Sequence, residues 1–457
     1  MTVSSSRRPA GSPTSSEGGE RPIARSRDLV PVVAALVLFA ATAVVGGFIQ
    51  RADGTLGTSW PPLLAHWMPH VGPGTPAAVA AAVLLVAYGP AVAARLPWRA
   101  LLASAWAAAL VWTFSLALID GWQRGIAGRL TTRHEYVPAV PRFHDILPTL
   151  QTFSQHIVGG HPGYWPAHVA GHPPGAVLTF VLLDRLGLGG GAWAGVFCIV
   201  AGTSVAVAAL VTLRCLCSES TARRAAPFLV LTPGAIWVGA SADGYFACVA
   251  AWALALLALA ATRRVRAPVA AALGSGLLFG LAVHVSYGLT LIALPGLAVL
   301  LAARNLRPLP YVLGAVAAVV AVFAVLGFRW WDAYPLLVER YDQGLGGVRP
   351  YSYWLFGDLA TAVASAGLAS VAGMGRVLRF PLRRHRGLVL LCCAFLLAIV
   401  AADLSGMSKA ETERIWLPFT LWLPASAALL PRGDHRGWLA AQACAALLIN
   451  HLLLTGW

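Results

Sequence analysis

The chain has 457 residues, of which 58% are hydrophobic and 11% charged, with a formal net charge of +15. Its mean hydropathy is +0.71. A water-soluble core cannot bury so much apolar surface, so the composition excludes an ordinary soluble protein and predicts a chain solvated by lipid. The arginines are scattered over short loops rather than gathered on one face, which argues against nucleic-acid binding.

Runs of about 17 to 25 apolar residues are long enough to cross a bilayer as helices. They are preceded by residues 1–28, rich in Ser, Pro, Gly and Arg, which we expect to form a disordered cytoplasmic tail. We predict an all-α polytopic membrane protein, with a transmembrane domain over 29–457 and juxtamembrane helices on the outer surface. About 13 spans are expected, near 29–50, 76–97, 100–119, 191–213, 225–242, 244–262, 267–284, 287–304, 309–327, 353–373, 387–402, 415–431 and 437–456.

The stretch 173–188 decides the sidedness of everything after it, because it is apolar but short and begins with two prolines. If it lies along the outer surface, the side of the N-terminal tail holds 22 of the 33 basic residues and 5 of the 18 carboxylates. This distribution satisfies the positive-inside rule, whereas a crossing segment would move fifteen of those arginines outside. We therefore expect a plasma-membrane protein with a cytoplasmic N-terminus and with extracytoplasmic loops over 120–190, 328–352 and 403–414.

Three carboxylates mark the first outer loop. Asp120 ends the third predicted span, Glu135 lies in the sequence RHEY, and Asp145 begins a predicted surface helix. Each would be unremarkable if solvated alone, but three in one structured loop suit proton transfer. A carboxylate near an arginine stays ionised and accepts a proton from a hydroxyl in a water-poor cleft. We rank Glu135 and Asp120 before Asp145 as the candidate general base.

The same loop carries an apolar stripe and six histidines. The stripe has helical spacing and predicts a helix that either lies in the membrane interface or packs on other outer loops: Phe143, Ile146, Leu147, Leu150, Phe153 and Ile157. The histidines match no paired zinc motif and are expected to form hydrogen bonds: His134, His144, His156, His161, His168 and His172. No metal site is assigned and no cofactor is required, although a divalent cation held by carboxylates is left open.

Two later outer segments place cations beside aromatic rings or carboxylates. Segment 329–354 sets Arg349 among tryptophans and tyrosines, which suits either an interfacial aromatic belt or the binding of sugar rings and phosphates. Segment 405–419 crowds Lys409, Glu411 and Arg414 directly before an apolar run. These charges are either solvated or hold a lipid phosphate, for which arginine offers a two-pronged donor and lysine a point charge.

The order of these features resembles that of the polytopic GT-C glycosyltransferases, which include the protein O-mannosyltransferases and the lipid A aminoarabinose transferases. In that family an acidic outer loop is followed by a His/Lys-Pro-Pro segment and then by a span that begins at Ser/Thr-Asp. Here the acidic loop precedes GHPPGAVL, with His172, and LTPGAIWVGASADGYF, with Asp243. The resemblance covers about residues 100 to 265. The acidic loop follows the third span rather than the first, and it lacks an adjacent acidic pair, so no subfamily is assigned.

The resemblance implies a GT-C-like membrane glycosyltransferase that moves a sugar from a polyprenyl-phosphate donor to an extracytoplasmic acceptor hydroxyl. The acceptor would be a cell-envelope glycan, lipid or protein. Glu135 or Asp120 would remove the proton of that hydroxyl while cations stabilise the leaving phosphate. The expected substrate-binding residues are His172, Asp243, Lys409, Glu411, Arg414 and Arg349.

A polytopic transporter or lipid flippase of the cell envelope is the alternative. Transporters place ionisable groups and broken helices at the bilayer midplane, whereas the centres of the predicted spans are nearly free of charge. A non-catalytic assembly protein of the envelope is a third interpretation, because a scaffold of this family can lose its base.

Overall fold

The computed structural model describes residues 17–379 and 385–456. Over this part the chain is all-α, as predicted, apart from two short strands, β1 (Ala65–Trp67) and β2 (Leu453–Thr455). The strands pair antiparallel, with Ala65 opposite Thr455. This pairing brings the last described residues beside the loop that follows the first helix.

Among residues 17–379 and 385–456, seven helical segments are long and apolar enough to cross a membrane, so the chain is a multi-pass membrane protein. The shortest has 18 residues, which at about 1.5 Å per residue approaches the thickness of the hydrocarbon core. The first helix begins within 1–28, so the end of the predicted tail is helical, and residues 1–16 lie outside the described part. The segments are built from α1 (Glu17–Ala52), α2 (Thr75–Arg95), α3 (Trp98–Ala117) with η1 (Leu118–Asp120), α7 (Gly191–Thr203) with α8 (Val205–Leu216), α11 (Ala242–Thr262), α12 (Pro268–Val285) and α19 (Arg386–Ser405).

Two further helix pairs are bent at a glycine. α14 (Leu309–Val325) and α15 (Trp330–Asp342) meet at 74°, and α17 (Tyr351–Ala366) and α18 (Leu368–Val377) meet at 104°. The linking residues Gly327 and Gly367 have φ angles of 105° and 86°, which glycine adopts without steric cost. Counting each pair as one span raises the number of candidate spans to nine.

The other segments predicted to cross are not counted as spans, and several are divided into shorter pieces. Segment 225–242 contains Pro227 and Pro233, and segment 415–431 contains three prolines, each of which removes a backbone donor. The count of about 13 spans is therefore not shown. The elements are α9 (Glu219–Val230), α10 (Ala235–Val238), η6 (Tyr287–Ile292), α13 (Ala293–Ala303), α16 (Leu345–Val348), α20 (Thr412–Ile415), α21 (Leu417–Thr420), η7 (Leu423–Leu429), η8 (Arg432–Asp434) and α22 (His435–Leu452).

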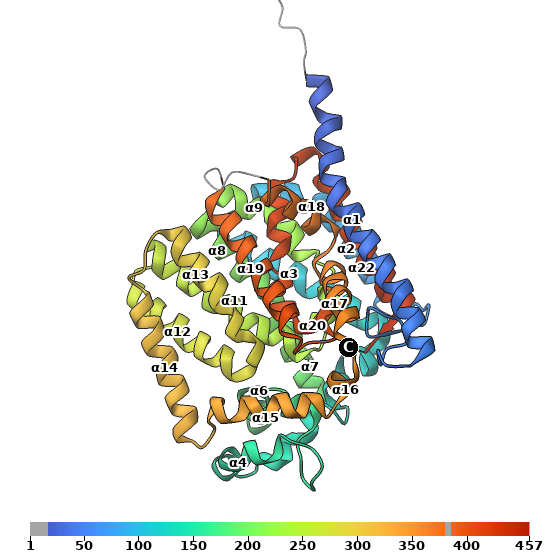
Figure 1. The fold of residues 1–457 in the computed structure, drawn as a ribbon. Helices are drawn as coiled ribbons and strands as arrows, with labels where there is room; N and C mark the ends of the chain where they lie inside the picture. Colours follow the sequence, from blue (N-terminus) through green and yellow to red (C-terminus); the bar gives the residue numbers. More distant parts are fainter. Residues whose placement is uncertain (1–16, 380–384, 457) are drawn as a thin grey trace, which may run out of the picture.

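The first outer loop is folded into short helical turns. Its last helix, in the stretch 173–188, has 11 residues and is too short to cross a bilayer. Figure 1 shows α4, α6 and α15 at the end of the molecule opposite the start of α1. The turns are η2 (Gln123–Ala127), η3 (Arg129–Thr131), η4 (Val137–Phe143), α4 (Ile146–Thr152), η5 (Phe153–His156), α5 (Ala167–Ala170) and α6 (Gly175–Arg185).

The apolar stripe of this loop packs against other outer segments. The ring of Phe153 lies 5.1 Å from that of Trp165 and 5.7 Å from that of Phe328. Phe143 stacks on the other side of the cluster, 5.5 Å from Trp165. All four side chains are buried, so of the two interpretations of the stripe the structure shows the packed one.

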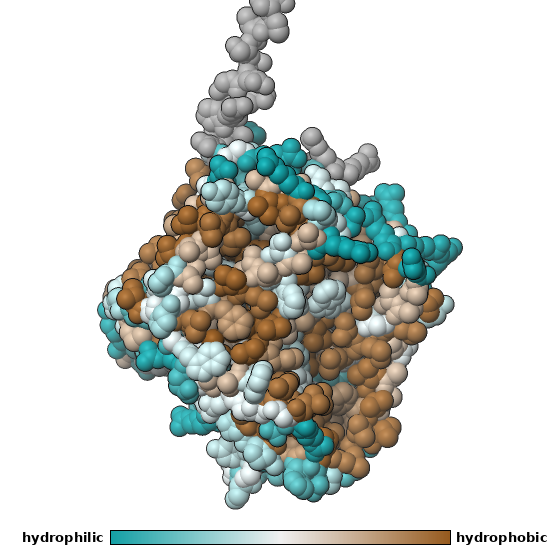
Figure 2. Space-filling view, turned by 180° about the vertical axis from the view of Figure 1, so that it is seen from behind, coloured by the Kyte–Doolittle hydropathy of each residue, from teal (hydrophilic) through white to brown (hydrophobic). Residues whose placement is uncertain are grey.

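Hydrophilic residues gather at two opposite ends of the surface, and hydrophobic residues form a broad band between them (Figure 2). Helices α9 and α18 lie near the end at which α1 starts (Figure 1). A soluble monomer rarely exposes so large a contiguous apolar area. The band therefore matches the region in which the long helices would be surrounded by lipid.

The two polar ends are predicted to face opposite sides of the membrane. Single cysteines at Asp145, in the exposed part of the first outer loop, and at Gly433, in an arginine-rich connection, would report this in a Cys444→Ala background, which removes the exposed native thiol. We expect a membrane-impermeant thiol reagent to label position 145 from outside intact cells and position 433 only after permeabilisation. Labelling of both positions from the same side would refute the assignment.

Candidate active site

The centre of the candidate site is a buried arginine held by two carboxylates. Arg414, in α20, contacts the Oδ2 of Asp243 with Nη1 at 2.5 Å and the Oε2 of Glu411 with Nη2 at 2.6 Å. The side chains of Arg414 and Asp243 are only 6% and 4% exposed. The two carboxylates raise the pKa of Arg414 although burial alone would lower it. Arg414 is therefore always charged, and its ion pairs join two parts of the chain.

The backbone places Asp243 at the start of a helix. Ser241 caps α11, and its Oγ accepts a hydrogen bond from the Asp243 N–H at 3.1 Å and donates to Asp243 Oδ2 at 3.0 Å. An acidic side chain in the first turn is favoured by the helix dipole. The break in the chain before α11 thus aims the carboxylate at Arg414.

The arginine also reaches Glu135 through a histidine. His168, in α5, lies with its Nε2 3.2 Å from Arg414 Nη2 and its Nδ1 2.8 Å from Glu135 Oε1. Glu135 is 2% exposed, and its other oxygen, Oε2, is buried without a hydrogen-bond partner among the described residues. We call Glu135, His168, Asp243, Glu411 and Arg414 the Arg414 network.

His172 and Tyr136 pack beside this network. His172 Nδ1 lies 2.8 Å from the backbone oxygen of His168 and 3.0 Å from the hydroxyl of Tyr136. Because the ring is buried, its pKa is lowered to about 4, so His172 is neutral at physiological pH. Burial also raises the pKa of Tyr136, whose ring stacks on Phe180 of α6 at 5.4 Å.

Arg349 adds a second buried cation on the other side of Glu411. Its Nη1 lies 3.8 Å from Glu411 Oε1 and donates to the backbone oxygen of Lys409 at 2.6 Å. Its Nε donates to the oxygen of Leu56 at 3.1 Å. The remaining nitrogen, Nη2, is buried without a hydrogen-bond partner in the described residues.

The turn that carries Lys409 and Glu411 has a strained backbone, which is stabilised by hydrogen bonds to Asp358. Ala410 and Glu411 have φ angles of 72° and 63°, a conformation that non-glycine residues rarely adopt. Oδ1 of the buried Asp358 accepts hydrogen bonds from the Ala410 N–H at 3.0 Å and from the Thr412 hydroxyl at 3.1 Å. Asp358 therefore fixes the position of the Glu411 carboxylate.

Glu413, beside Arg414 in α20, is buried and forms no ion pair with another described residue. Its Oε1 accepts a hydrogen bond from the Leu64 N–H at 3.0 Å, and its Oε2 has no partner among the described residues. Burial raises the pKa of Glu413 to about 7. It is therefore partly protonated near neutral pH, unlike Glu411, whose pKa the neighbouring arginines lower.

Asp120 and Asp145 lie outside the Arg414 network. Asp120 contacts His70 Nε2 at 2.7 Å and Arg129 Nη2 at 3.1 Å, and no hydrogen bond or ion pair among the described residues joins it to Arg414. Asp145 is 76% exposed, 3.4 Å from the exposed His144. Of the three carboxylates predicted in this loop, the structure brings only Glu135 to the network.

The other predicted residues converge, and three more belong with them. Arg349, Asp243, Glu411 and Arg414 are in contact, His172 flanks them, and the Lys409 side chain lies over Tyr341, 5.7 Å from the ring centre. Sequence reasoning missed His168, Asp358 and Glu413 as site residues. A usable signal for His168 was its place one helical turn before His172.

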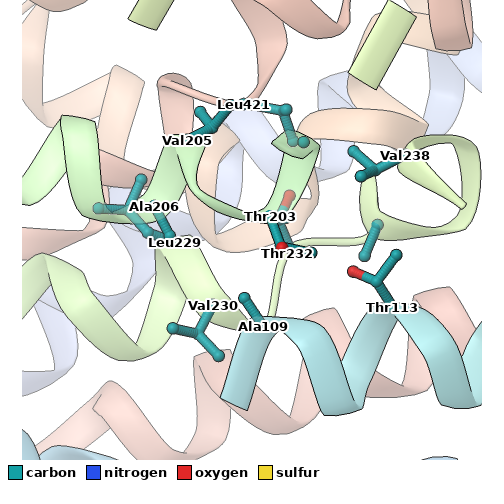
Figure 3. A pocket seen from close by; sticks show the side chains of 12 residues that line it. Ala109, Thr113, Thr203, Val205, Ala206, Leu229, Val230, Thr232, Val238 and Leu421 are labelled. Carbon is teal, nitrogen blue, oxygen red and sulfur yellow. The ribbon is translucent and has the colours of Figure 1, made fainter. Parts of the chain in front are cut away.

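Two hollows lie near these elements, but neither is lined by the Arg414 network. Figure 3 shows the hydroxyl-bearing residues Thr113, Thr203 and Thr232 around a small cavity of about 20 Å³ inside the bundle. This is room for one water molecule. A larger hollow of about 310 Å³ lies between η4 and α6, lined mainly by apolar side chains such as Val137 and Phe180.

The described part of the chain contains no preformed metal-binding site. Residues 17–379 and 385–456 contain no group of three or more His, Cys, Asp or Glu side chains arranged to hold a metal ion. The carboxylates of the Arg414 network face arginines instead. A role for a divalent cation stays an untested prediction.

The chain is structurally similar to the crystal structure of the Archaeoglobus fulgidus oligosaccharyltransferase tethered with an acceptor peptide containing the NVT sequon, with a TM-score of 0.42 and 14% sequence identity. The match covers 71% of this chain and 49% of that chain, so the chain spans about half the length of the structure it matches. No protein-family model and no curated protein matches the sequence.

Breaking the central ion pair should destabilise the fold. Arg414→Gln or Asp243→Asn leaves a buried charge without its partner, which costs about 3 to 5 kcal/mol of unfolding free energy. The matched control is Arg329→Gln, because the Arg329–Asp332 pair is exposed and 3.9 Å apart, and such pairs contribute about 1 kcal/mol or less. Chemical unfolding of the detergent-solubilised protein measures the free energy of unfolding of each variant. Equal losses in all three variants would contradict a stabilising role of the buried ion pair.

Glu413 should make stability depend on pH. Its pKa is raised from 4.5 to about 7, so between these values the folded state holds a proton that the unfolded chain has released. The free energy of unfolding then falls as pH rises through this window, by up to about 3 kcal/mol, and levels off above it. Glu413→Gln cannot titrate but keeps the acceptor for Leu64, so it should flatten the slope. Unfolding curves with the same slope in both proteins would exclude this role.

Proposed function

We propose that the chain is a GT-C-type glycosyltransferase that transfers a sugar from a polyprenyl-phosphate donor to an acceptor hydroxyl at the extracytoplasmic face of the plasma membrane. Two findings support the proposal. Glu135, His172 and Asp243 follow the order of the family's sequence motifs. The structure links Glu135 to Asp243 through His168 and Arg414, with His172 beside them, in a multi-pass membrane protein. A lipid-borne donor would reach this site laterally from the bilayer.

The observation that carries the proposal is the asymmetry of the Glu135 carboxylate. Oε1 is held by His168 at 2.8 Å, whereas Oε2 is buried and unpartnered among the described residues. A buried carboxylate oxygen without a hydrogen-bond partner is a strong acceptor for a hydroxyl group. In the proposed step the acceptor hydroxyl gives its proton to Oε2 and its oxygen forms a bond to the anomeric carbon. The bond from that carbon to the phosphate oxygen breaks, and the polyprenyl phosphate leaves with the electron pair.

The leaving phosphate needs preorganised cations. Both terminal nitrogens of Arg414 already contact carboxylates, so its proposed role is to organise Glu411 and Asp243 rather than to meet the phosphate first. Arg349 keeps Nη2 without a partner among the described residues, and the Lys409 ammonium lies over an aromatic ring nearby. We assign the phosphate to Arg349 and Lys409.

A transporter or lipid flippase is the second candidate, and the broken helices favour it. The breaks at 231–241 and around 405–423 are more extensive than the sequence predicted, and discontinuous helices are typical of transporters. The charged network at these breaks includes Glu135 and His168 of the first outer loop, which favours a reaction at that loop over a path through the molecule.

Glu135→Gln is expected to abolish most transfer activity. General base catalysis contributes roughly 100- to 10,000-fold, and the amide retains the size of the carboxylate without its basicity. The assay uses the full chain in nanodiscs with synthetic farnesyl-phosphate-linked hexoses and pentoses and measures release of farnesyl phosphate in the presence of an envelope glycan extract.

The control for this experiment is Asp332→Asn, which alters an exposed carboxylate of α15 and should leave the rate unchanged. Equal rates for the wild type and Glu135→Gln would refute the role of Glu135. Movement of the intact farnesyl-phosphate sugar across a proteoliposome membrane without its cleavage would replace the transferase by the flippase.

A further inference from the structure

The tautomer of His168 is determined by its two neighbours. An arginine guanidinium has hydrogen-bond donors only, so the nitrogen that faces Arg414 Nη2 at 3.2 Å, Nε2, must accept. A neutral imidazole with an accepting Nε2 carries its proton on Nδ1. That proton points at Glu135 Oε1, which lies 2.8 Å away.

The two other states of the ring are disfavoured by the same distances. The tautomer with the proton on Nε2 would set a donor against the Arg414 donor and leave the lone pair of Nδ1 facing a carboxylate oxygen. The imidazolium would satisfy Glu135 but would place a second positive group against Arg414 with two N–H groups facing each other. In either state two donors face each other between His168 Nε2 and Arg414 Nη2. Such an unfavourable polar contact costs more free energy in the buried site, where the dielectric is low, than in water.

We infer that Arg414 locks His168 as a neutral imidazole with its proton on Nδ1, and that His168 in this form is a positioning residue that holds Glu135 Oε1 and leaves Oε2 to face the acceptor hydroxyl. The inference deepens the proposed function and rests on it for the role of Oε2. His168 does not take part in proton transfer: the proton passes from the hydroxyl to Glu135, and the ring keeps its own throughout.

The backbone supports this orientation of the ring. The His168 N–H donates to the backbone oxygen of His134 at 2.9 Å, which ties α5 to the residue before Glu135. The His168 backbone oxygen in turn faces Nδ1 of His172 at 2.8 Å, so this nitrogen of His172 must donate. Both backbone polar groups of His168 are therefore hydrogen-bonded, which fixes the position of the Cα from which the ring reaches Glu135 and Arg414.

Several titratable groups surround His168 and bear on any pH dependence. The carboxylates of Glu135 and Glu411 favour a positive ring, whereas Arg414 and the imidazoles of His134 and His172 oppose it. His172 is neutral near pH 7 because burial lowers its pKa to about 4. Arg414 is the group in direct contact that opposes protonation, so its removal is the decisive perturbation.

The first test reads the tautomer without any substrate. Magic-angle-spinning spectra of the full chain with ¹⁵N-labelled histidine in lipid bilayers distinguish protonated from unprotonated ring nitrogens, and the His168 signals are identified by their loss in His168→Asn. We expect a protonated Nδ1 and an unprotonated Nε2 at pH 7. In Arg414→Gln the single tautomer should be lost, because Nε2 then no longer faces a group that has donors only.

The inference about the tautomer would be refuted by a wild-type His168 that carries its proton on Nε2 or on both nitrogens. An unchanged tautomer in Arg414→Gln would equally remove Arg414 as its cause. If Arg414→Gln fails to fold, Arg414→Lys serves in its place, since a lysine ammonium also donates only; it should preserve the tautomer, and loss of the tautomer there would count against the inference.

The second test reads the positioning role in farnesyl phosphate release. His168→Ala should lower kcat roughly 10- to 100-fold, the effect of losing one hydrogen bond to a charged group, with little change in KM. His168→Asn supplies an amide donor in the place of Nδ1 and should recover part of the rate, whereas His168→Gln should not.

The outcomes separate the two claims. Equal rates in His168→Asn and His168→Gln would refute positioning through Nδ1. A wild-type chain that releases no farnesyl phosphate from any donor would refute the proposed function, and the tautomer would still be decided by the spectra.

Discussion

The candidate active site depends on one buried cation. Arg414 is joined to Asp243 at the start of α11, to Glu411 on the turn before α20 and, through His168, to Glu135 of the first outer loop. Desolvating an arginine costs several kcal/mol, which only close and well-oriented carboxylates offset. The three segments, far apart in sequence, are therefore fixed relative to one another, because separating them would leave charge buried and unpaired.

The same requirement explains where the helices break. A continuous helix satisfies its own backbone and offers no turn from which to aim a carboxylate, so Asp243 follows the break capped by Ser241, and Glu411 sits on a left-handed turn braced by Asp358. In a membrane protein, non-helical backbone is tolerated only where it is buried in protein or lines a hydrated cavity. Both breaks end at the Arg414 network, so the irregular backbone and the charges explain each other.

Much of the network could be predicted because charged residues are rare in so apolar a chain. Hydropathy, however, measures the apolarity of a window and not the regularity of its backbone, so 225–242 and 415–431 were counted as spans although they are broken. Asp120 and Glu135 look alike in sequence, and only the fold shows that Asp120 is bound by His70, which lies 50 positions earlier. His168 could not be predicted as a site residue, because the loop contains six histidines without fixed spacing and the sequence does not show which of them faces a carboxylate.

The network is not explained by stability alone. Replacing a buried ion pair by packed apolar residues is often neutral or stabilising, and each buried polar atom without a partner costs about 1 to 3 kcal/mol. Yet Glu135 Oε2 and Arg349 Nη2 are both buried without a hydrogen-bond partner among the described residues. Contacts through His168, Arg414 and Glu411 connect these two side chains. One atom needs a donor and the other needs an acceptor. A pair of ligands that brings a hydroxyl to the first and an anionic oxygen to the second satisfies both at once, and an acceptor alcohol meeting a sugar phosphate is such a pair.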